Sequence, residues 1–227
     1  MRACVVVFPG SNADAEMIRT LRDVCGAPTS VAWHTDTALP AGTDLVAIPG
    51  GFAYGDYLRC GAIAKVSPIV ASIRAHAARG GHVLGVCNGF QILTEIGLLP
   101  GALTRNLHMR FECGDRHVKV TAGGPFTPMV GDVWRLPVAH AEGRYQASEA
   151  VLKELEDGDR IALRYCTPTG ALTDDANPNG SLHAIAGIYA GPKKNVFGLM
   201  PHPERISEEI LGGADGKVLF ESVLRAS

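Results

Sequence analysis

The chain has no cysteine pair at C-x-x-C spacing, no long apolar run and no long run of charge of one sign. Its six scattered cysteines argue against a disulfide framework in a chain of 227 residues. The apolar N-terminal stretch stops at Pro9, and no stretch approaches the roughly 18 apolar residues of a membrane span. The formal net charge is only -2, which favours neither nucleic acid nor a membrane surface as a partner. We therefore expect a cytoplasmic protein that binds neither.

Two common kinds of ligand site are also missing. Residues 212–218 superficially resemble a phosphate-binding loop, but their glycine spacing is wrong and no serine or threonine follows Lys217. Histidines and cysteines do not cluster at the spacing of zinc ligands. We therefore expect no ATP site, no metal ion and no cofactor on this chain.

What is present is the composition of an ordinary globular protein, with 46% hydrophobic and 19% charged residues. Short β-branched runs alternate with helical patterns, which is typical of a parallel sheet wrapped by helices. Ser11 or Asn12 is expected to cap the first helix, and Gly26 to end it. The pattern predicts helices near 13–25, 68–78, 89–96 and 217–225, and strands near 3–8, 31–34, 45–48, 82–86, 117–120, 134–139, 160–165, 184–189 and 196–199.

The middle of the chain, residues 117–190, has predicted strands without convincing helices between them. This pattern favours an antiparallel extension of the main sheet. No linker or break in composition divides the chain, and the glycine- and proline-rich residues 167–181 are predicted to be a surface loop. We expect a single domain over residues 1–227, built on an open, mostly parallel α/β sheet that is flanked by helices.

Cys87 stands in the most informative segment of the chain. An apolar strand is predicted to run into it, a helix to begin directly after it, and Gly85 and Gly89 flank it two residues away on either side. This is the G-x-nucleophile-x-G pattern of a nucleophile elbow, where glycine avoids the Cβ clashes of a sharp turn. A helix N-terminus also favours the thiolate. We predict that Cys87 is a catalytic nucleophile; the alternative is a structural cysteine in a glycine-rich turn.

A cysteine nucleophile needs a base, and the base needs a third group to orient it. His202 follows an apolar strand at the sheet edge where open α/β sheets place their sites, and the flanking Pro201 and Pro203 restrict its backbone. Glu204 is expected at a surface-opening position, from which it can reach back to the imidazole. We predict that His202 is the base and Glu204 its orienter; the alternative is a turn histidine beside an exposed glutamate.

Two backbone N–H groups are candidates for an oxyanion hole. The N–H of Asn88, directly after the cysteine, would point into the space in front of the thiol. The predicted strand 45–48 leads into Gly50-Gly51, and a diglycine turn lets backbone approach a ligand closely. We predict Asn88 and Gly51 as the donors, although an ordinary tight turn would also explain the two glycines.

These motifs together resemble the class I (triad) glutamine amidotransferases, through residues 85–91 and 202–204. Longer stretches are similar to the glutaminase subunits of phosphoribosylformylglycinamidine synthase; they are residues 9–12, 50–59, 139–145 and 177–181. The matches span residues 9–205. Two small residues differ from the usual pattern, Ala53 where serine is common and Ala141 where glycine is common, and neither affects the triad.

The resemblance implies a flavodoxin-like fold and the roles already predicted for the triad and the oxyanion donors. It adds Gln91, which would help to hold the substrate glutamine. It also implies a large synthetase subunit that binds ATP and Mg, and a small accessory subunit. The chain would hydrolyse glutamine to glutamate and ammonia. With that ammonia and ATP, the synthetase would convert formylglycinamide ribonucleotide to formylglycinamidine ribonucleotide in de novo purine biosynthesis.

Two other functions stay open at this point. A γ-glutamyl hydrolase or a cysteine peptidase would use the same constellation, and a non-enzymatic α/β scaffold would keep Cys87 as a structural residue. Residues 52–59 contain two tyrosines, an aspartate and an arginine, a composition typical of contact surfaces. We expect a partner to bind near this segment and to order the Gly51 turn. For residues 139–145 the sequence offers no physical account.

Overall fold

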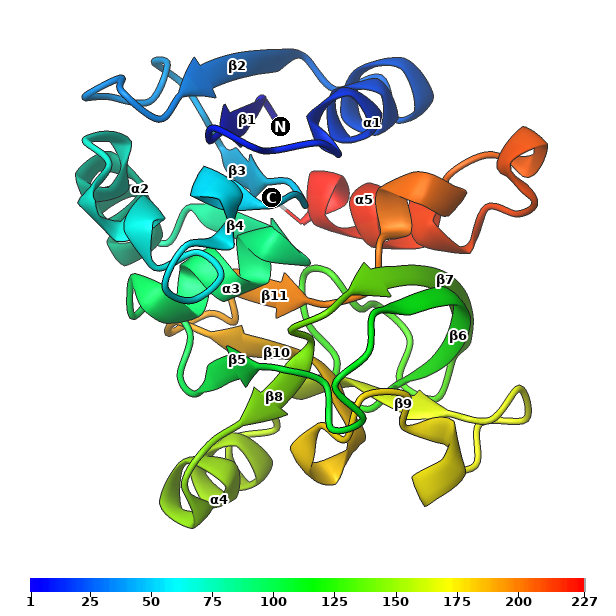
Figure 1. Ribbon diagram of the computed structural model, residues 1–227. Helices are drawn as coiled ribbons and strands as arrows, with labels where there is room; N and C mark the ends of the chain where they lie inside the picture. Colours follow the sequence, from blue (N-terminus) through cyan, green and yellow to red (C-terminus); the bar gives the residue numbers. More distant parts are fainter. Residues whose placement is uncertain (227) are drawn as a thin grey trace.

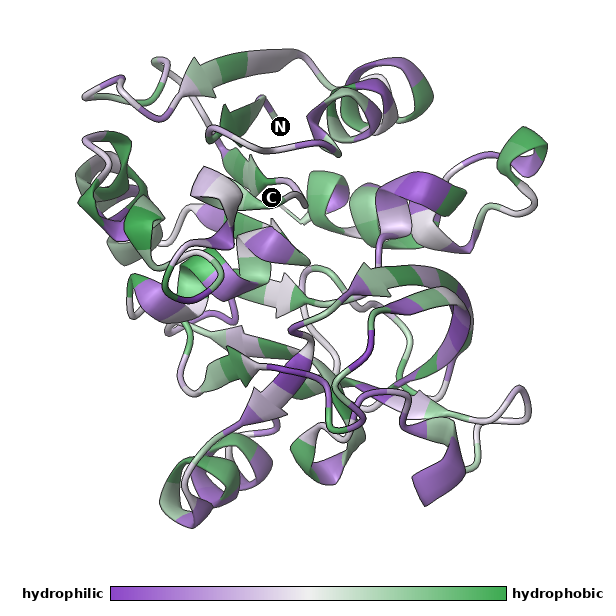
Figure 2. Ribbon diagram, in the orientation of Figure 1, coloured by the Kyte–Doolittle hydropathy of each residue, from purple (hydrophilic) through white to green (hydrophobic). Residues whose placement is uncertain are grey.

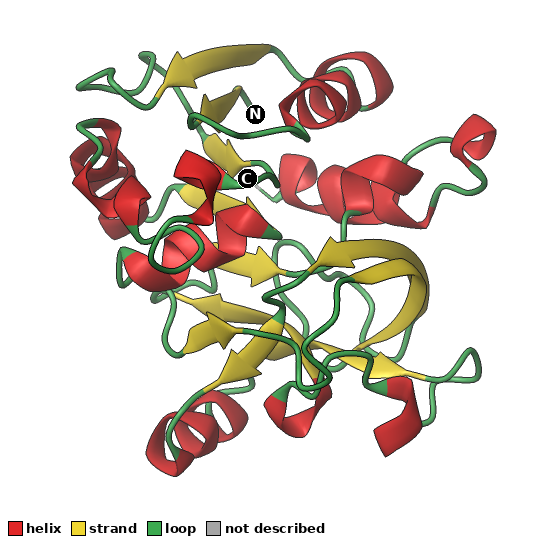
Figure 3. Ribbon diagram, viewed as in Figure 1, coloured by secondary structure: helices red, strands yellow, loops and turns green. Residues whose placement is uncertain are grey.

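The computed structural model describes residues 1–226, in which nine strands form one sheet and two short strands form another (Figures 1 and 3). The small sheet pairs β5 (Ala102–Thr104) with β8 (Arg144–Gln146). The large sheet contains β1 (Ala3–Val7), β2 (Thr29–Trp33), β3 (Leu45–Ile48), β4 (His82–Val86), β6 (Glu112–Val120), β7 (Val133–His140), β9 (Ile161–Cys166), β10 (Ile185–Ala190) and β11 (Val196–Leu199).

The large sheet has a parallel half and an antiparallel half. Its strand order is β2-β1-β3-β4-β11-β10-β9-β6-β7. The pairings from β2 to β11 are parallel, and those from β11 to β7 are antiparallel. Alternating antiparallel pairings return β9 and β7 to the direction of β11, so most strands still point the same way. The predicted mostly parallel sheet with an antiparallel extension is confirmed.

Burial follows the two halves. Strands β1, β3 and β11 are buried at every residue, because helices cover both faces of the parallel half. The apolar sequences of β1 and β3 are mostly green in Figure 2. Along β7, intermediate and buried residues alternate, as expected for a strand with one face on the core. The parallel half therefore supplies the rigid centre of the molecule.

Helices lie on both sides of the central strands in Figure 1, with α2 (Ile69–Ala78) and α3 (Asn88–Glu95) on one side, and α1 (Asp14–Arg19) and α5 (Asp215–Arg225) on the other. The first predicted helix is confirmed but is not regular throughout, because α1 continues as a π-helical turn, η1 (Thr20–Val24). This turn lies against α5. None of the helices among residues 1–226 is long and apolar enough to cross a bilayer.

The expected cap of the first helix is wrong. The N-cap position is Ala13, and no side chain caps the helix. Ser11 instead accepts a hydrogen bond from the Phe8 N–H at 3.1 Å, while Gly50 O accepts the N–H groups of Asn12 and Ala13. A tertiary contact therefore replaces the local cap. The predicted end is confirmed: Gly26 has φ of +70°, and the N–H of the next residue bonds back to Leu21 O.

The expectation of no helix in the middle of the chain is also wrong. Helix α4 (Glu149–Asp157) lies there, and Ser148 caps it by accepting from the Val151 N–H. Its buried residues are Leu152 and Leu155, three apart on the face that meets the core. The serine cap and the spacing of the two leucines are both visible in the sequence, so local patterns were sufficient to predict this helix.

Candidate active site

Cys87 lies on the sharp turn that its flanking glycines predict. The turn joins β4 to α3, and Cys87 has φ of 51° and ψ of -106°. A Cβ at Gly85 would lie 2.6 Å from Gly89 O, and one at Gly89 would lie 2.1 Å from Ile48 O. Both positions therefore admit only glycine. Among the six cysteines, Cys87 alone has a positive φ, which marks strain maintained by the surrounding structure.

His202 and Glu204 form a buried pair next to this turn. Nδ1 of His202 lies 2.5 Å from Oε1 of Glu204, and the two residues are only 2% and 1% exposed. The His202 N–H donates to Pro137 O at 2.8 Å, which ties the loop after β11 to β7. Since Nδ1 is committed to Glu204, Nε2 remains for chemistry. The expected surface-opening position of Glu204 is wrong, because η6 (Pro203–Ile206) is covered by α1 and α5.

The environment of His202 favours the imidazolium. Burial alone would lower its pKa, but the negative charges of Glu204 and of a Cys87 thiolate outweigh burial and raise the pKa of His202 to about 10. The site therefore supports an imidazolium at His202 at neutral pH. An imidazolium in this position can donate a proton to a leaving group beside Cys87.

Gly50 brings the two halves of this pair together. A Cβ at Gly50 would lie 2.6 Å from Cε1 of His202 and 3.4 Å from Cβ of Cys87. The side chains of Cys87 and His202 therefore meet over residue 50, and this residue must lack a side chain. The diglycine in the sequence indicated this turn, but a role was predicted only for Gly51 and not for Gly50.

The predicted oxyanion donors lie at the same edge. Among the described residues, neither the Gly51 N–H nor the Asn88 N–H takes part in a hydrogen bond within the chain. The diglycine turn is not free, because Gly50 O accepts from Asn12 and the Phe52 N–H donates to Gly10 O at 2.8 Å. Both N–H groups are therefore free to donate to a ligand beside Cys87, and their role as oxyanion donors stays a prediction.

The side chain of Gln91 is already bonded at both ends. Its Oε1 accepts from Asn88 Nδ2 at 2.8 Å, and its Nε2 donates to Glu142 O at 2.7 Å. The other end of the Asn88 amide, Oδ1, accepts from the Ala53 N–H. Gln91 therefore links the start of α3 to the loop after β7, and a role in holding glutamine stays a prediction.

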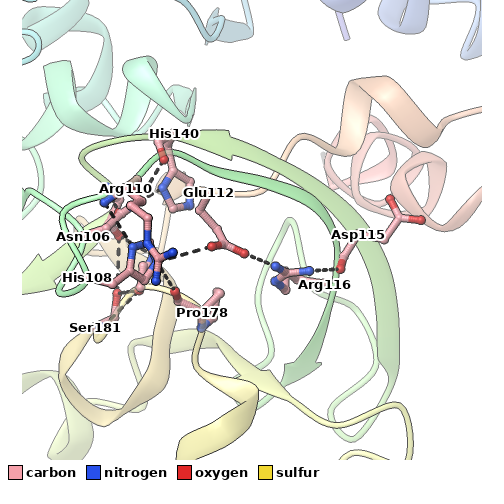
Figure 4. A network of polar contacts seen from close by, with 11 residues as sticks. Asn106, His108, Arg110, Glu112, Asp115, Arg116, His140, Pro178 and Ser181 are labelled. Carbon is pink, nitrogen blue, oxygen red and sulfur yellow. Dashed lines mark hydrogen bonds and ion pairs between the residues drawn. The ribbon is translucent and has the colours of Figure 1, made fainter.

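The loop after β7 now has a physical account. Asn106 anchors both ends of this loop. Its Nδ2 donates to His140 O at 2.9 Å, and its Oδ1 accepts from the Gly143 N–H. The same Oδ1 lies 3.1 Å from Nδ1 of His140 (Figure 4). Asn179 Nδ2 donates to Gly143 O at 2.9 Å. Ala139 O, near the end of β7, lies 3.8 Å from the Cys87 thiol, so the loop that follows begins beside the site. Sequence reasoning missed Asn106, for which no local pattern was available.

The predicted surface loop at 167–181 is only partly correct. Residues 171–175 are exposed, whereas Asn179 and Ser181 are buried. Ser181 accepts from the Tyr145 N–H at 2.9 Å. Tyr145 lies on β8, the strand that follows the loop after β7. The end of the segment is therefore structural, because it satisfies backbone groups of the loop beside Cys87.

His140 is a neutral partner in this site. Burial and the nearby charge of His202 lower its pKa to about 4. Asn106 Oδ1 can only accept, so we assign the proton to Nδ1 of His140. Figure 4 shows Glu112 and Arg116 continuing the polar network away from this histidine.

Comparison with known proteins shows the family of the chain. Residues 1–212 match the model of the CobB/CobQ-like glutamine amidotransferase domain. The chain belongs to this glutamine amidotransferase family. Family membership makes glutamine amide hydrolysis the chemistry of the chain, in agreement with the resemblance in its motifs.

Within the glutamine amidotransferases, two relatives about half identical to this chain carry the same subunit name. The chain is 52% identical to phosphoribosylformylglycinamidine synthase subunit PurQ of Bradyrhizobium diazoefficiens, over 97% of this chain and 95% of that protein. It is 51% identical to PurQ of Rhodospirillum rubrum, over 100% and 99%. A chain in the structure of PurLQS from Thermotoga maritima matches with a TM-score of 0.86 and 41% identity, over 99% of this chain and 98% of that one.

Gly50→Ala is expected to lower the rate of glutamine hydrolysis at least ~100-fold, because the new Cβ must displace His202 or Cys87. Gly123→Ala is the matched control, since its nearest neighbour would be an ordinary 3.5 Å away. Steady-state glutaminase rates and thermal unfolding of both variants would be measured. If a folded Gly50→Ala protein kept more than half of wild-type activity, the proposed meeting point of the two side chains would be wrong.

Proposed function

We propose that this chain is the glutaminase subunit of a phosphoribosylformylglycinamidine synthase, hydrolysing glutamine through Cys87, His202 and Glu204. The observation that carries the proposal is the buried His202–Glu204 pair, which meets the strained Cys87 at Gly50. Relatives about half identical over nearly their whole length support the assignment to this synthase.

In the proposed reaction, the Cys87 thiolate attacks the side-chain amide carbon of glutamine. The oxyanion is stabilised by the N–H groups of Gly51 and Asn88. The His202 imidazolium then donates the Nε2 proton to the departing nitrogen, the C–N bond breaks, and ammonia leaves a γ-glutamyl thioester on the sulfur.

The second half of the reaction regenerates the starting pair. His202, now neutral, accepts a proton from water as the water oxygen attacks the thioester carbon. Collapse of this intermediate breaks the C–S bond, which returns the thiolate and releases glutamate. Throughout, Glu204 holds Nδ1 of His202 and stabilises each imidazolium.

The proposal includes two partners. A large synthetase subunit would bind ATP and Mg, consume the ammonia and act on formylglycinamide ribonucleotide, and a small accessory subunit would complete the assembly in the cytoplasm. The solved structure of PurLQS and the subunit names of the relatives support an assembly of this kind. Glutamine itself would bind in front of the thiol, between the oxyanion donors and the loop after β7.

Two exposed apolar segments border the proposed site and form its docking surface. One contains Phe52, Tyr57 and Leu58, and it begins where Ala53 bonds to the Asn88 side chain. The other, residues 107–111, exposes Leu107, Met109 and Phe111 directly after Asn106, the anchor of the loop beside Cys87. Large apolar side chains gathered around a site opening are typical of a protein interface.

The docking surface predicts that the isolated chain is a weak glutaminase which its partner activates. A partner on residues 52–58 would press on the diglycine turn, since Phe52 is bonded to Gly10 and follows Gly51. Removing one oxyanion donor costs roughly a hundredfold in rate, so activation of about that size is expected. Steady-state glutaminase rates of the isolated chain and of the substrate-loaded complex would be compared.

Two matched variants test whether the docking surface is responsible for this activation. Leu58 is 92% exposed within the docking surface, and Ile210 is 87% exposed outside it. Leu58→Asp is expected to reduce activation by the synthetase and Ile210→Asp to leave it intact. Equal glutaminase rates for the isolated and assembled wild-type chain would contradict the activation.

The proposed function is tested directly with the purified chain and its synthetase. Glutamine and ATP together are expected to support conversion of formylglycinamide ribonucleotide to formylglycinamidine ribonucleotide, and ammonium salts to replace both glutamine and this chain. Turnover of γ-glutamyl peptides without any contribution to that synthesis would instead identify a γ-glutamyl hydrolase.

A further inference from the structure

The carboxylate of Glu204 has only one partner. Oε1 lies 2.5 Å from Nδ1 of His202, whereas Oε2 is buried and bonded to nothing among the described residues. The side chain has 0% exposure, so bulk water does not supply the missing hydrogen bond. Because no second side chain holds the carboxylate, its position depends on how the Glu204 backbone is held.

Two hydroxyl groups hold that backbone. Oγ1 of Thr20 lies 3.3 Å from Glu204 O and 3.0 Å from Oγ of Ser207, which itself lies 3.5 Å from the same carbonyl. Thr20 and Ser207 are each 1% exposed. The three groups form a closed buried triangle, with the carbonyl as its acceptor.

The proton count shows that the hydroxyls are interchangeable. Each hydroxyl has one proton, and one of the two protons is used between them. If Thr20 donates to Glu204 O, Ser207 donates to Thr20; in the other arrangement, Thr20 donates to Ser207, which donates to Glu204 O. Either residue can therefore serve the carbonyl when the other is missing.

Thr20 is itself firmly placed. It begins the π-helical turn η1, and the preceding helix α1 is anchored near its start because Gly50 O accepts the N–H of Ala13. Helix α1 also contacts the segment after His202 through the ion pairs Arg205–Glu16 and Arg19–Glu208. The hydroxyl thus reaches Glu204 from an element fixed against the diglycine turn.

We propose that Thr20 and Ser207 are positioning residues for the reaction, holding the backbone of Glu204 so that its carboxylate stays aligned with His202. The inference rests on the proposed function. Loss of both hydroxyls should let Glu204 shift and should weaken its bond to the imidazolium. Loss of one should have little effect.

The pKa of His202 depends directly on how well the Glu204 carboxylate is aligned with the imidazolium. The titratable groups around His202 are Glu204 after β11, Cys87 on the β4–α3 turn and the neutral His140 on β7. Only the first is held by Thr20 and Ser207. When that hold weakens, the pKa of His202 should fall from its raised value, because the stabilising carboxylate is less well aligned while burial is unchanged.

The test compares Thr20→Val, Ser207→Ala, the double variant, and Thr20→Ser combined with Ser207→Ala. In the assembled complex, kcat/KM for glutamine is expected to fall less than about 1.5-fold in each single variant and about tenfold or more in the double variant. The falling, alkaline limb of its pH profile should move to lower pH in the double variant alone. The Thr20→Ser combination, which keeps one hydroxyl, should remain near wild type.

A second readout needs no catalysis. NMR titration of the His202 imidazole in the isolated chain is expected to show a lower pKa in the double variant than in the wild type, with thermal unfolding measured beside it. An unchanged His202 titration, or losses in kcat/KM that simply multiply, would overturn the positioning role. If wild-type complex itself fails to hydrolyse glutamine, the proposed function fails instead, and the two failures are distinguished.

Discussion

Cys87→Ser in the complex is expected to abolish glutamine-dependent synthesis while leaving ammonia-dependent synthesis unchanged. Serine keeps the shape of the side chain and so fits the strained turn between β4 and α3. Its hydroxyl is far less acidic than a thiol, so the attacking anion forms far less readily. Loss of a nucleophile lowers the rate of hydrolysis by at least ~10³-fold.

The control for this variant is Cys166→Ser. Cys166 is 4% exposed and Cys87 is 5% exposed, so the two substitutions place a hydroxyl at similarly buried sites. Cys166 lies on β9, and its replacement should leave both activities near wild type. Glutamine- and ammonia-dependent product formation would be measured on the same preparations. Equal loss of both activities in the Cys87 variant would make this cysteine structural.

Glu204→Gln is expected to slow glutamine hydrolysis by roughly 100-fold or more. The amide cannot stabilise the imidazolium, so burial then dominates and the pKa of His202 falls. The alkaline limb of the activity profile should therefore move to lower pH. Glu209→Gln is the control, because Glu209 is an exposed glutamate in the same segment between β11 and α5.

The same variant should change how stability depends on pH. In the wild type, the pKa of His202 is raised from 6.5 to about 10, so its contribution to stability is complete below the lower value and is lost as pH rises through the upper one. Between pH 7 and pH 10, the difference in unfolding free energy between wild type and Glu204→Gln should therefore shrink. Chemical denaturation across this range measures it, and a difference independent of pH would contradict the assigned pair.

Local sequence patterns were enough for most of the parallel half and for the sharp turn at Cys87. Uninterrupted apolar runs predict strands buried on both faces, as found for β1 and β3. The glycines beside Cys87 predict a turn that excludes side chains, which the close approaches at Gly85 and Gly89 explain. Less was readable where strands form through pairing. Residues 112–116 include three charged residues and no apolar run, yet they belong to β6 because β7 lies beside them.

The sequence by itself determined the types of chemistry available to this protein: a strained cysteine between glycines, a histidine between prolines and a glutamate two residues later. These are short-range features, and steric and dihedral constraints act within a few residues of each. Only the tertiary structure decided that Glu204 is buried and that Thr20, 184 positions away, bonds to its carbonyl. Only packing brings Asn106 to the loop of His140. Such contacts depend on where whole helices and strands come to lie, and no periodicity in a local window records that.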